Sequence, residues 1–299
     1  MLSTGEYAKL FRSPVLLNRE ASFKRGCALL LGGFDGLHVG HATLIDAAKS
    51  TGLPVAAMTI CEGKGTPLFT KEERMEIFRA CGVSLAYPLD FPRIKDVSAR
   101  DFACGIVSAS HAMHAFCGED FRFGAGGGAS GGDFERFTGV PVTVCPLKTD
   151  ADGEKIGSER IKELLSLGDA ATVSKLLVGG FFLRGEVVKD RGVGRTIGFP
   201  TANIRYPEGK HPLKHGVYET RAVIDGKEYR GVTNFGARPT FGVFAVTTET
   251  HFIGYTGDLY GKTLTLRFIR FLRDVCEFSD ADALKKQLQG DVRRVKESD

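Results

Sequence analysis

The pattern of apolar segments along the chain changes once, at Gly179-Gly180. This change constrains the fold more than any other feature. Before it, strand-like apolar runs alternate with helix-like segments; the runs are residues 27–31, 54–60, 112–117 and 140–145. Strands that alternate with helices predict a parallel sheet with helices on its faces. We therefore expect a Rossmann-like α/β domain over residues 1–180, in which residues 158–167 and 169–178 form a closing pair of helices.

After Gly180 the apolar segments are short, alternating and rich in β-branched and aromatic residues; they are residues 185–188, 217–224, 247–253 and 263–269. Asp225-Gly226 stands between two of them and is a typical hairpin turn. Closely spaced strands with turn signals predict a small antiparallel barrel. We expect this barrel over residues 181–299, covered by a terminal helix at residues 281–295.

Length and charge narrow the class of protein. A chain of 299 residues is long enough for two domains of ordinary size. The formal net charge of +4 suits anionic small molecules but is too weak to favour a nucleic-acid partner. The first residues show no signal-peptide pattern, and no apolar run reaches membrane-spanning length. The sequence therefore predicts a cytoplasmic protein with no membrane partner, and it predicts no oligomeric state.

The stretch Gly32–His41 reads GGFDGLHVGH and joins a strand-like run to the start of a helix-like segment. Free N–H groups and the helix dipole favour an anion at such a turn, and glycines let it approach the backbone. His38 and His41 are placed to donate to phosphate oxygens as charge develops in a transition state. The alternative is a glycine-rich turn with incidental histidines.

Two further motifs contain glycines next to polar residues. Residues 117–124, CGEDFRFG, follow a strand, and by themselves they indicate no more than a turn with an Asp–Arg pair. Residues 191–203 read RGVGRTIGFPTAN, in which the glycines allow close approach to phosphates. Thr201 and Asn203, two apart in an extended segment, project to one side and offer uncharged oxygens to a phosphate-bound Mg²⁺.

Glu249 is two residues before His251 in a predicted strand, so both side chains face one way. A carboxylate in this position is suited to act as the base that activates a substrate hydroxyl. Taken without the other motifs, an exposed strand glutamate is the simpler interpretation.

Together these motifs resemble those of the bacterial bifunctional riboflavin kinase/FAD synthetase family, over nearly the whole chain. The order and spacing of the matching stretches make the resemblance specific. The stretches are residues 33–41, 118–124, 198–203, 216–218, 238–241, 249–251 and 258–262.

For the barrel, the resemblance implies transfer of the γ-phosphoryl group of ATP to the ribityl hydroxyl of riboflavin, which gives FMN. It implies that Thr201 and Asn203 hold Mg²⁺ and that Glu249 is the base. The residues implied on the nucleotide side are Gly192, Gly194, Arg195, Gly198, Phe199, Pro200, Asp258, Leu259 and Tyr260. His251 and Arg273 are implied on the flavin side.

For the α/β domain, the resemblance implies attack of the FMN phosphate on the α-phosphorus of a second ATP, which releases pyrophosphate and gives FAD. His38 and His41 would stabilise that transition state. The implied nucleotide-binding residues are Gly33, Phe34, Asp35, Gly36, Gly40, Ser158 and Lys162. Those implied on the flavin side are Asp120, Phe121 and Arg122.

Two motifs of the α/β domain depart from the family pattern. Where relatives carry Pro-His-Pro, the chain reads Cys61-Glu62-Gly63, and the family's Ser-Ser-x-x-Ile-Arg reads GSERIK at residues 157–162. Lys162 keeps the charge of the arginine but lacks its two-pronged guanidinium. Three hypotheses follow: a bifunctional enzyme, a kinase with a weak or lost adenylyltransferase, and a non-catalytic flavin-binding protein.

Overall fold

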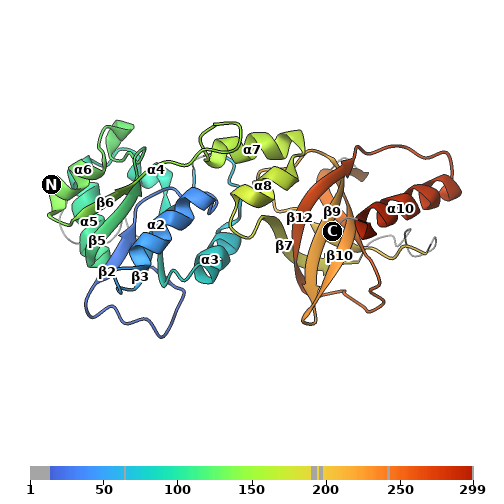
Figure 1. Ribbon diagram of the computed structural model, residues 1–299, viewed down its shortest axis with the longest axis horizontal. Coiled ribbons are helices and arrows are strands. Elements are labelled where there is room, and N and C mark those ends of the chain that lie inside the picture. Colours follow the sequence, from blue (N-terminus) through green and yellow to red (C-terminus); the bar gives the residue numbers. More distant parts are fainter. Residues whose placement is uncertain (1–13, 64, 190–193, 195–197, 241–242, 298–299) are drawn as a thin grey trace. The chain divides into compact units, whose positions relative to one another are not determined.

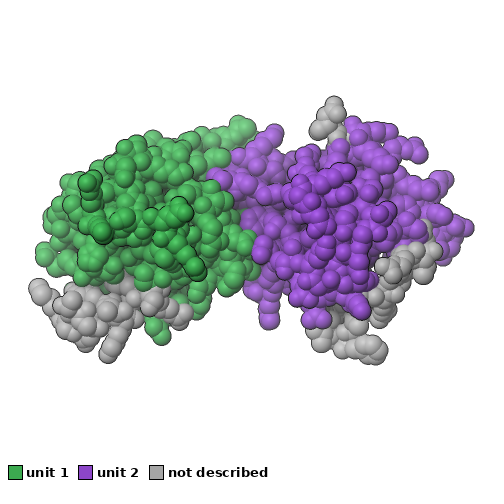
Figure 2. Space-filling model, turned by 90° about the horizontal axis from the view of Figure 1, so that it is seen from below, with its two compact units in different colours: residues 1–160 green, residues 161–299 purple. Residues whose placement is uncertain are grey.

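The computed structural model describes residues 14–297, except for residues 64, 190–193, 195–197 and 241–242, and the side chains of residues 237–245 are also not described. The chain divides into two compact units, Met1–Arg160 and Ile161–Asp299 (Figures 1 and 2). Each unit has its own sheet.

The first unit contains a six-stranded sheet in the order β1-β4-β3-β2-β5-β6. Its parallel strands are β2 (Cys27–Leu30), β3 (Val55–Glu62), β4 (Leu85–Asp90), β5 (Ala112–Gly118) and β6 (Val142–Cys145). A short strand, β1 (Val15–Leu16), adds an antiparallel edge beside β4. The expected Rossmann-like parallel sheet is confirmed.

The helices of this unit follow the strands in sequence (Figure 1). They are α2 (Val39–Lys49), α3 (Lys71–Ala80), α4 (Phe91–Ile94), α5 (Ala99–Ser110) and α6 (Gly131–Thr138), with a 3₁₀ turn at Ala125–Gly127. A capping box begins α3: the Thr70 hydroxyl accepts from the Glu73 N–H at 3.2 Å, and the Glu73 carboxylate accepts from the Thr70 N–H at 2.9 Å. This box satisfies two free donors and fixes the start of the helix.

Two helices precede the barrel, as expected: α7 (Ser158–Leu167) and α8 (Ala170–Leu176). The division between the units falls inside α7, so the structure groups α8 with the barrel. Ser174 of α8 donates its hydroxyl to the Phe268 carbonyl at 3.1 Å, and the Lys214 N–H donates to the Leu165 carbonyl at 2.9 Å. The boundary expected at Gly180 therefore lies about 20 residues after the division between the two units, which falls between Arg160 and Ile161.

The second unit is a closed barrel in the order β10-β11-β8-β7-β12-β9, which confirms the expected architecture. Its strands are β7 (Phe181–Val188), β8 (Ala202–Arg205), β9 (Gly216–Ile224), β10 (Lys227–Thr240), β11 (Val243–Phe252) and β12 (Thr263–Arg273). Asp225 and Gly226 join β9 to β10 with φ of 50° and 81°, as a two-residue hairpin turn requires. Buried aromatic side chains fill the interior; they include Phe181, Tyr218, Phe235 and Phe268.

The terminal helix, α10 (Ala281–Lys296), covers the barrel as expected. Its Val295 is fully buried in a cluster with Val217, Val232 and Leu272. A salt bridge between Arg273 of β12 and the fully buried Asp291 of α10, at 2.8 Å, adds a polar anchor.

Candidate active sites

In the first unit, His38 and His41 lie at the start of α2, as the sequence predicts. His38 is the N-cap residue, and its Nδ1 accepts a hydrogen bond from the His41 backbone N–H at 3.3 Å. His41 Nδ1 lies 3.0 Å from the Gly36 carbonyl. The two rings stack with their centroids 3.6 Å apart. The turn therefore holds both imidazoles in one fixed orientation.

These contacts determine the proton positions on both rings. A backbone N–H only donates, so a neutral His38 carries its proton on Nε2; a carbonyl only accepts, so His41 carries its proton on Nδ1. Burial lowers the pKa of His38 to about 4; the charge of Asp120 raises this pKa by a smaller amount, and the charge of Lys155 lowers it. Burial, together with His38, also holds the pKa of His41 well below its usual range. Both rings are therefore neutral at pH 7 before a ligand binds.

The turn before the histidines has one residue in a strained backbone conformation, and packing and hydrogen bonds hold it in place. Phe34 has a φ of 44°, which is unusual for a residue other than glycine, and its buried ring packs 4.6 Å from the His41 ring. The Gly33 carbonyl accepts from the Thr59 hydroxyl and from the Ile60 N–H, both at 3.0 Å. A Cβ atom at Gly33 would meet no atom within 4 Å, so the space next to its Cα is open.

The end of β5 brings a charged pair close to His38. Asp120 forms a salt bridge with Lys155, and both charges are near enough to His38 to affect its pKa. Lys155 was not among the residues predicted from the sequence, because it lies 35 positions from Asp120 and belongs to no motif of its own. The tertiary structure thus adds a lysine to this site.

The other two predicted residues of this motif face different surroundings. Phe121 is buried in the hydrophobic core, where its ring stacks on Phe123 at 5.5 Å. Arg122 donates to the carbonyls of Glu119 and Phe121, at 3.0 and 2.8 Å, and so closes the turn after β5. Of the three residues predicted on the flavin side, the structure brings Asp120 close to His38.

The altered motif at residues 157–162 begins α7. Ser158 and Lys162 are four residues apart and so share one helix face. Arg160 points elsewhere: it pairs with Asp150 at 2.9 Å and with Asp152 at 2.8 Å. Arg160 is thus held by two carboxylates. It does not take the place of the arginine that the family pattern has where this chain has Lys162.

In the second unit, strand register brings together residues that are distant in sequence. Glu249 of β11 is directly opposite Asn203 of β8 on one side and Asn234 of β10 on the other. Directly opposed residues point to the same face, with Cβ atoms about 4.5–5.5 Å apart. The sequence motifs predicted Asn203 and Glu249 but not Asn234.

The side-chain oxygen of Asn203 is buried and finds no hydrogen-bond partner among the residues that the structure describes. Buried polar atoms are nearly always bonded, so this acceptor calls for an explanation. With Thr201 two residues earlier, it forms a set of uncharged oxygens, which fits a Mg²⁺ ion whose charge is balanced by phosphates.

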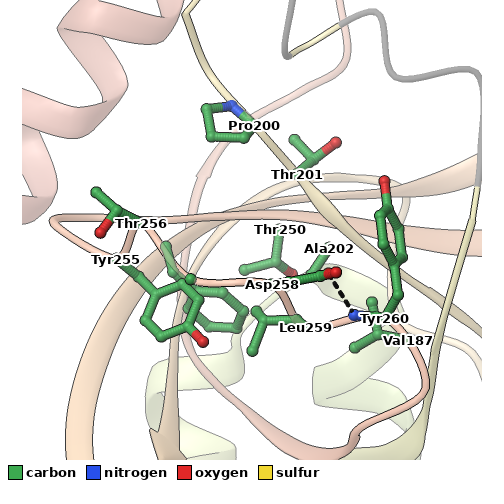
Figure 3. A pocket seen from close by; sticks show the side chains of 12 residues that line it. Val187, Pro200, Thr201, Ala202, Thr250, Tyr255, Thr256, Asp258, Leu259 and Tyr260 are labelled. Atoms are coloured by element: carbon green, nitrogen blue, oxygen red, sulfur yellow. Dashed lines mark hydrogen bonds between the residues drawn. The ribbon is translucent and has the colours of Figure 1, made fainter.

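A pocket of about 200 Å³ opens beside this group (Figure 3). Its walls come from the end of β7, the start of β8, the end of β11 and the loop after it; they include Val187, Pro200, Thr201, Thr250, Tyr255, Asp258, Leu259 and Tyr260. Asp258 accepts from the Tyr260 N–H at 3.0 Å and so shapes the loop. Four residues predicted on the nucleotide side thus line one cavity: Pro200, Asp258, Leu259 and Tyr260.

Five other predicted residues of this unit fall into three groups. Phe199 packs edge-on against His251 at 5.1 Å, and His251 Nδ1 lies 3.0 Å from the Pro200 carbonyl. A side chain on Gly194 would clash with the Phe199 carbonyl at 2.3 Å, so only glycine fits there. Gly192 and Arg195 lie outside the described residues.

Arg273, predicted on the flavin side, is occupied by other groups. It binds Asp291, the Asp274 carbonyl and the Cys276 sulfur, the last at 3.3 Å. These contacts give Arg273 a role in anchoring α10, and its flavin contact stays a prediction.

Comparison with known proteins gives both halves a family. A riboflavin kinase family model matches residues 178–298, and an FAD synthetase family model matches residues 20–160. The chain is 33% identical over 287 residues to a bifunctional riboflavin kinase/FMN adenylyltransferase of Pseudomonas fluorescens, covering 90% of this chain and 91% of that protein. It is 30% identical over 304 residues to the enzyme of the same name from Escherichia coli K12, covering 94% and 95%.

A solved structure also matches over nearly the full length. This crystal structure from Streptococcus pneumoniae, described as a macrolide-efflux protein, superposes with a TM-score of 0.84 at 27% identity and covers 94% of this chain and 97% of its own. In the described part of this chain, no helix combines the length and apolar character needed to cross a bilayer.

The sheet unit, the barrel unit and the family models define a two-domain transferase, in which a nucleotidyltransferase domain precedes a kinase domain. The chain belongs to the family of bifunctional riboflavin kinase/FMN adenylyltransferases.

Proposed function

We propose that the barrel phosphorylates riboflavin with ATP to give FMN and that the sheet unit adenylylates FMN with a second ATP to give FAD. The observation that carries the proposal is the group on β8 and β11, where a buried oxygen of Asn203 without a described partner lies opposite Glu249. Family membership supports both activities.

In the kinase reaction, Glu249 accepts the proton of the riboflavin 5′-hydroxyl as its oxygen forms a bond to the γ-phosphorus. The bond between that phosphorus and the β–γ bridging oxygen breaks, and ADP leaves. Mg²⁺, when bound, neutralises charge on the phosphates. Thr201 and Asn203 would hold it with their oxygens, and the pocket at Asp258–Tyr260 would take the nucleotide. Positioning and charge neutralisation are the main needs of phosphoryl transfer.

In the adenylyl transfer, a phosphate oxygen of FMN forms a bond to the α-phosphorus of ATP. The bond between that phosphorus and the α–β bridging oxygen breaks, and pyrophosphate leaves. Neutral His38 presents an Nε2–H donor to the phosphates, because its Nδ1 is used by the His41 N–H. His41 presents an Nε2 lone pair until a phosphate oxygen beside it favours the protonated ring. The free N–H groups at the start of α2 add to the attraction for the phosphates.

One observation favours the kinase-only alternative, and another opposes it. Arg160 is bound to Asp150 and Asp152, which leaves Lys162 as the cation of the altered motif. Lys155, however, places a second ammonium group close to His38. This ammonium group is paired with Asp120 but half exposed, so it can turn toward a phosphate, which supports a working adenylyltransferase.

The test is to incubate the pure protein with riboflavin, ATP and Mg²⁺ and to separate FMN from FAD by chromatography. Formation of both products is expected. FMN without FAD, also when FMN is the added substrate, would support the kinase-only alternative. Tight flavin binding without any product would support the non-catalytic hypothesis.

A further inference from the structure

Arg74 of α3 is an arginine buried beneath the histidine turn, with 1% of its side chain exposed. Its position in the sequence, four residues after a helix N-cap, gives no reason to bury it. An isolated buried charge is very costly, so the groups around it determine what it does.

Every described contact of the Arg74 guanidinium goes to the turn or to segments that support it. One nitrogen, Nη1, donates to the Thr59 hydroxyl at 3.1 Å and to the Ile60 carbonyl, at the end of β3, and lies 3.9 Å from the Cys61 sulfur. The other, Nη2, donates to the Asp35 carboxylate at 3.3 Å and to the Phe69 carbonyl at 3.4 Å.

Two short chains of hydrogen bonds lead from Arg74 to the turn. Through Thr59, whose hydroxyl donates to the Gly33 carbonyl, Arg74 fixes the first residue of the turn. Through Asp35, which also accepts from the Leu68 N–H at 2.8 Å, it fixes the third. The residue between them is Phe34, with its positive φ.

The held residues are in direct contact with the catalytic ring. Phe34 packs on the His41 ring, and Gly36, the next residue after Asp35, accepts from His41 Nδ1. An error of about 1 Å in such a group can cost about 100-fold in rate. The Arg74 fork thus reaches Gly33 and Asp35, the residues on either side of Phe34, in the segment that orients His41.

We infer that Arg74 is a positioning residue of the adenylyltransferase site, which holds turn 33–36 so that His41 keeps its orientation toward the ATP phosphates. The inference rests on the proposed adenylyl transfer. A planar guanidinium suits this site because its two terminal nitrogens, held at a fixed spacing, serve Thr59 and Asp35 at once, whereas an ammonium group donates from a single nitrogen.

The experiment compares Arg74→Met and Arg74→Lys with Arg79→Met in the full-length protein. Arg79 lies on the same helix, is exposed, and donates to the Leu17 carbonyl, away from the turn. Three quantities are measured for each variant: kcat and KM for FAD formation from FMN, the rate of FMN formation by the other unit, and the NMR signals of the histidine rings. The signals of His38 and His41 are assigned with single alanine variants.

Arg74→Met is expected to lower kcat for FAD formation by about 10- to 100-fold with a smaller change in KM, the effect of a misplaced catalytic group. Arg74→Lys is expected to recover part of this loss. FMN formation stays at the parent rate in both variants, and Arg79→Met resembles the parent. The His41 ring signals shift in both Arg74 variants and not in Arg79→Met.

Parent-like kcat and unmoved His41 signals in Arg74→Met would overturn the inference. So would a loss of FAD formation that matches only the unfolded fraction, measured by thermal unfolding, while the His41 signals of the folded fraction do not move. If the parent itself makes no FAD, the proposed function of this unit fails, and the shift of the His41 signals still decides whether Arg74 holds the ring.

Discussion

Glu249 is the residue that we propose as the general base of the kinase reaction. Strand register places it opposite Asn203 and Asn234. We expect Glu249→Gln to lower kcat for FMN formation by about 10²–10⁴-fold, the usual scale for loss of a general base. Glutamine keeps the shape of the side chain but takes no proton. A change confined to KM would instead make Glu249 a binding residue. FAD formation from added FMN serves as the control and should not change.

Asn203→Ala separates a ligand-binding oxygen from a structural one. Removing a bonded buried acceptor costs about 1–3 kcal/mol of stability, whereas the Asn203 oxygen has no described partner to lose. We therefore expect FMN formation to be abolished while the thermal unfolding midpoint changes little. Parent-like FMN formation at low Mg²⁺ concentrations would contradict the assignment.

His41→Ala tests the histidine turn in the same way. Loss of a preorganised ring that donates from Nε2 once the phosphates favour its protonation should lower FAD formation by about 100-fold or more, with a smaller effect on ATP binding. FMN formation should stay unchanged, because the riboflavin kinase match covers the other unit. A variant that makes FAD as fast as the parent would show that the ring takes no part in the reaction.

The two histidines also predict how stability depends on pH. Because burial lowers the pKa of His38 to about 4, and that of His41 well below its usual value, the unfolded chain binds more protons than the folded one as the pH falls below about 6.5. Stability of the first unit should therefore fall from pH 6.5 toward pH 4, by at most about 1.4 kcal/mol per pH unit for each histidine. Denaturant unfolding of the parent and of His38→Gln across this range measures the difference, and equal slopes would contradict it.

At the scale of elements, α10 is anchored to the barrel by one buried ion pair and a small apolar cluster. Asp291→Asn leaves Arg273 without its carboxylate, and loss of one partner of a buried pair costs roughly 3 kcal/mol. We expect a lower unfolding midpoint for the barrel, measured by calorimetry. Asp282→Asn on the exposed first turn of α10 is the matched control and should have a much smaller effect. Equal effects of the two changes would show that the ion pair does not anchor the helix.

The same pair bears on the flavin contact predicted for Arg273. If Arg273 serves mainly to hold α10, Asp291→Asn and Arg273→Met should lower the unfolding midpoint alike. A large rise in KM for riboflavin in Arg273→Met alone would support the flavin contact instead.

For the whole molecule, the grouping of α8 and of α7 from Ile161 onward with the barrel predicts where the chain can be divided. A fragment of residues 158–299 should fold and make FMN, and it should unfold at a higher temperature than a fragment of residues 181–299. The longer fragment keeps the Ser174–Phe268 and Lys214–Leu165 hydrogen bonds. Equal unfolding temperatures would show that the two helices add nothing to the barrel.

Local pattern alone predicted much of this protein. The Asp225-Gly226 hairpin and the helix at residues 281–295 are both confirmed, because each depends on residues within a few positions of one another. Strand β4 was not predicted, since Pro88 inside it argues against a strand when the neighbours are unknown. The histidine turn was found because its strand, glycines and helix are consecutive.

The tertiary structure decided which side chains from distant parts of the sequence come into contact. Strand register or packing between distant segments brings Asn234 opposite Glu249, pairs Lys155 with Asp120 and buries Arg74 under the turn. Burial also determined charge: two histidines that the sequence leaves titratable are held neutral. The sequence thus determined the elements and the chemical groups available, whereas their distances, protonation and partners depend on long-range packing, which no local pattern encodes.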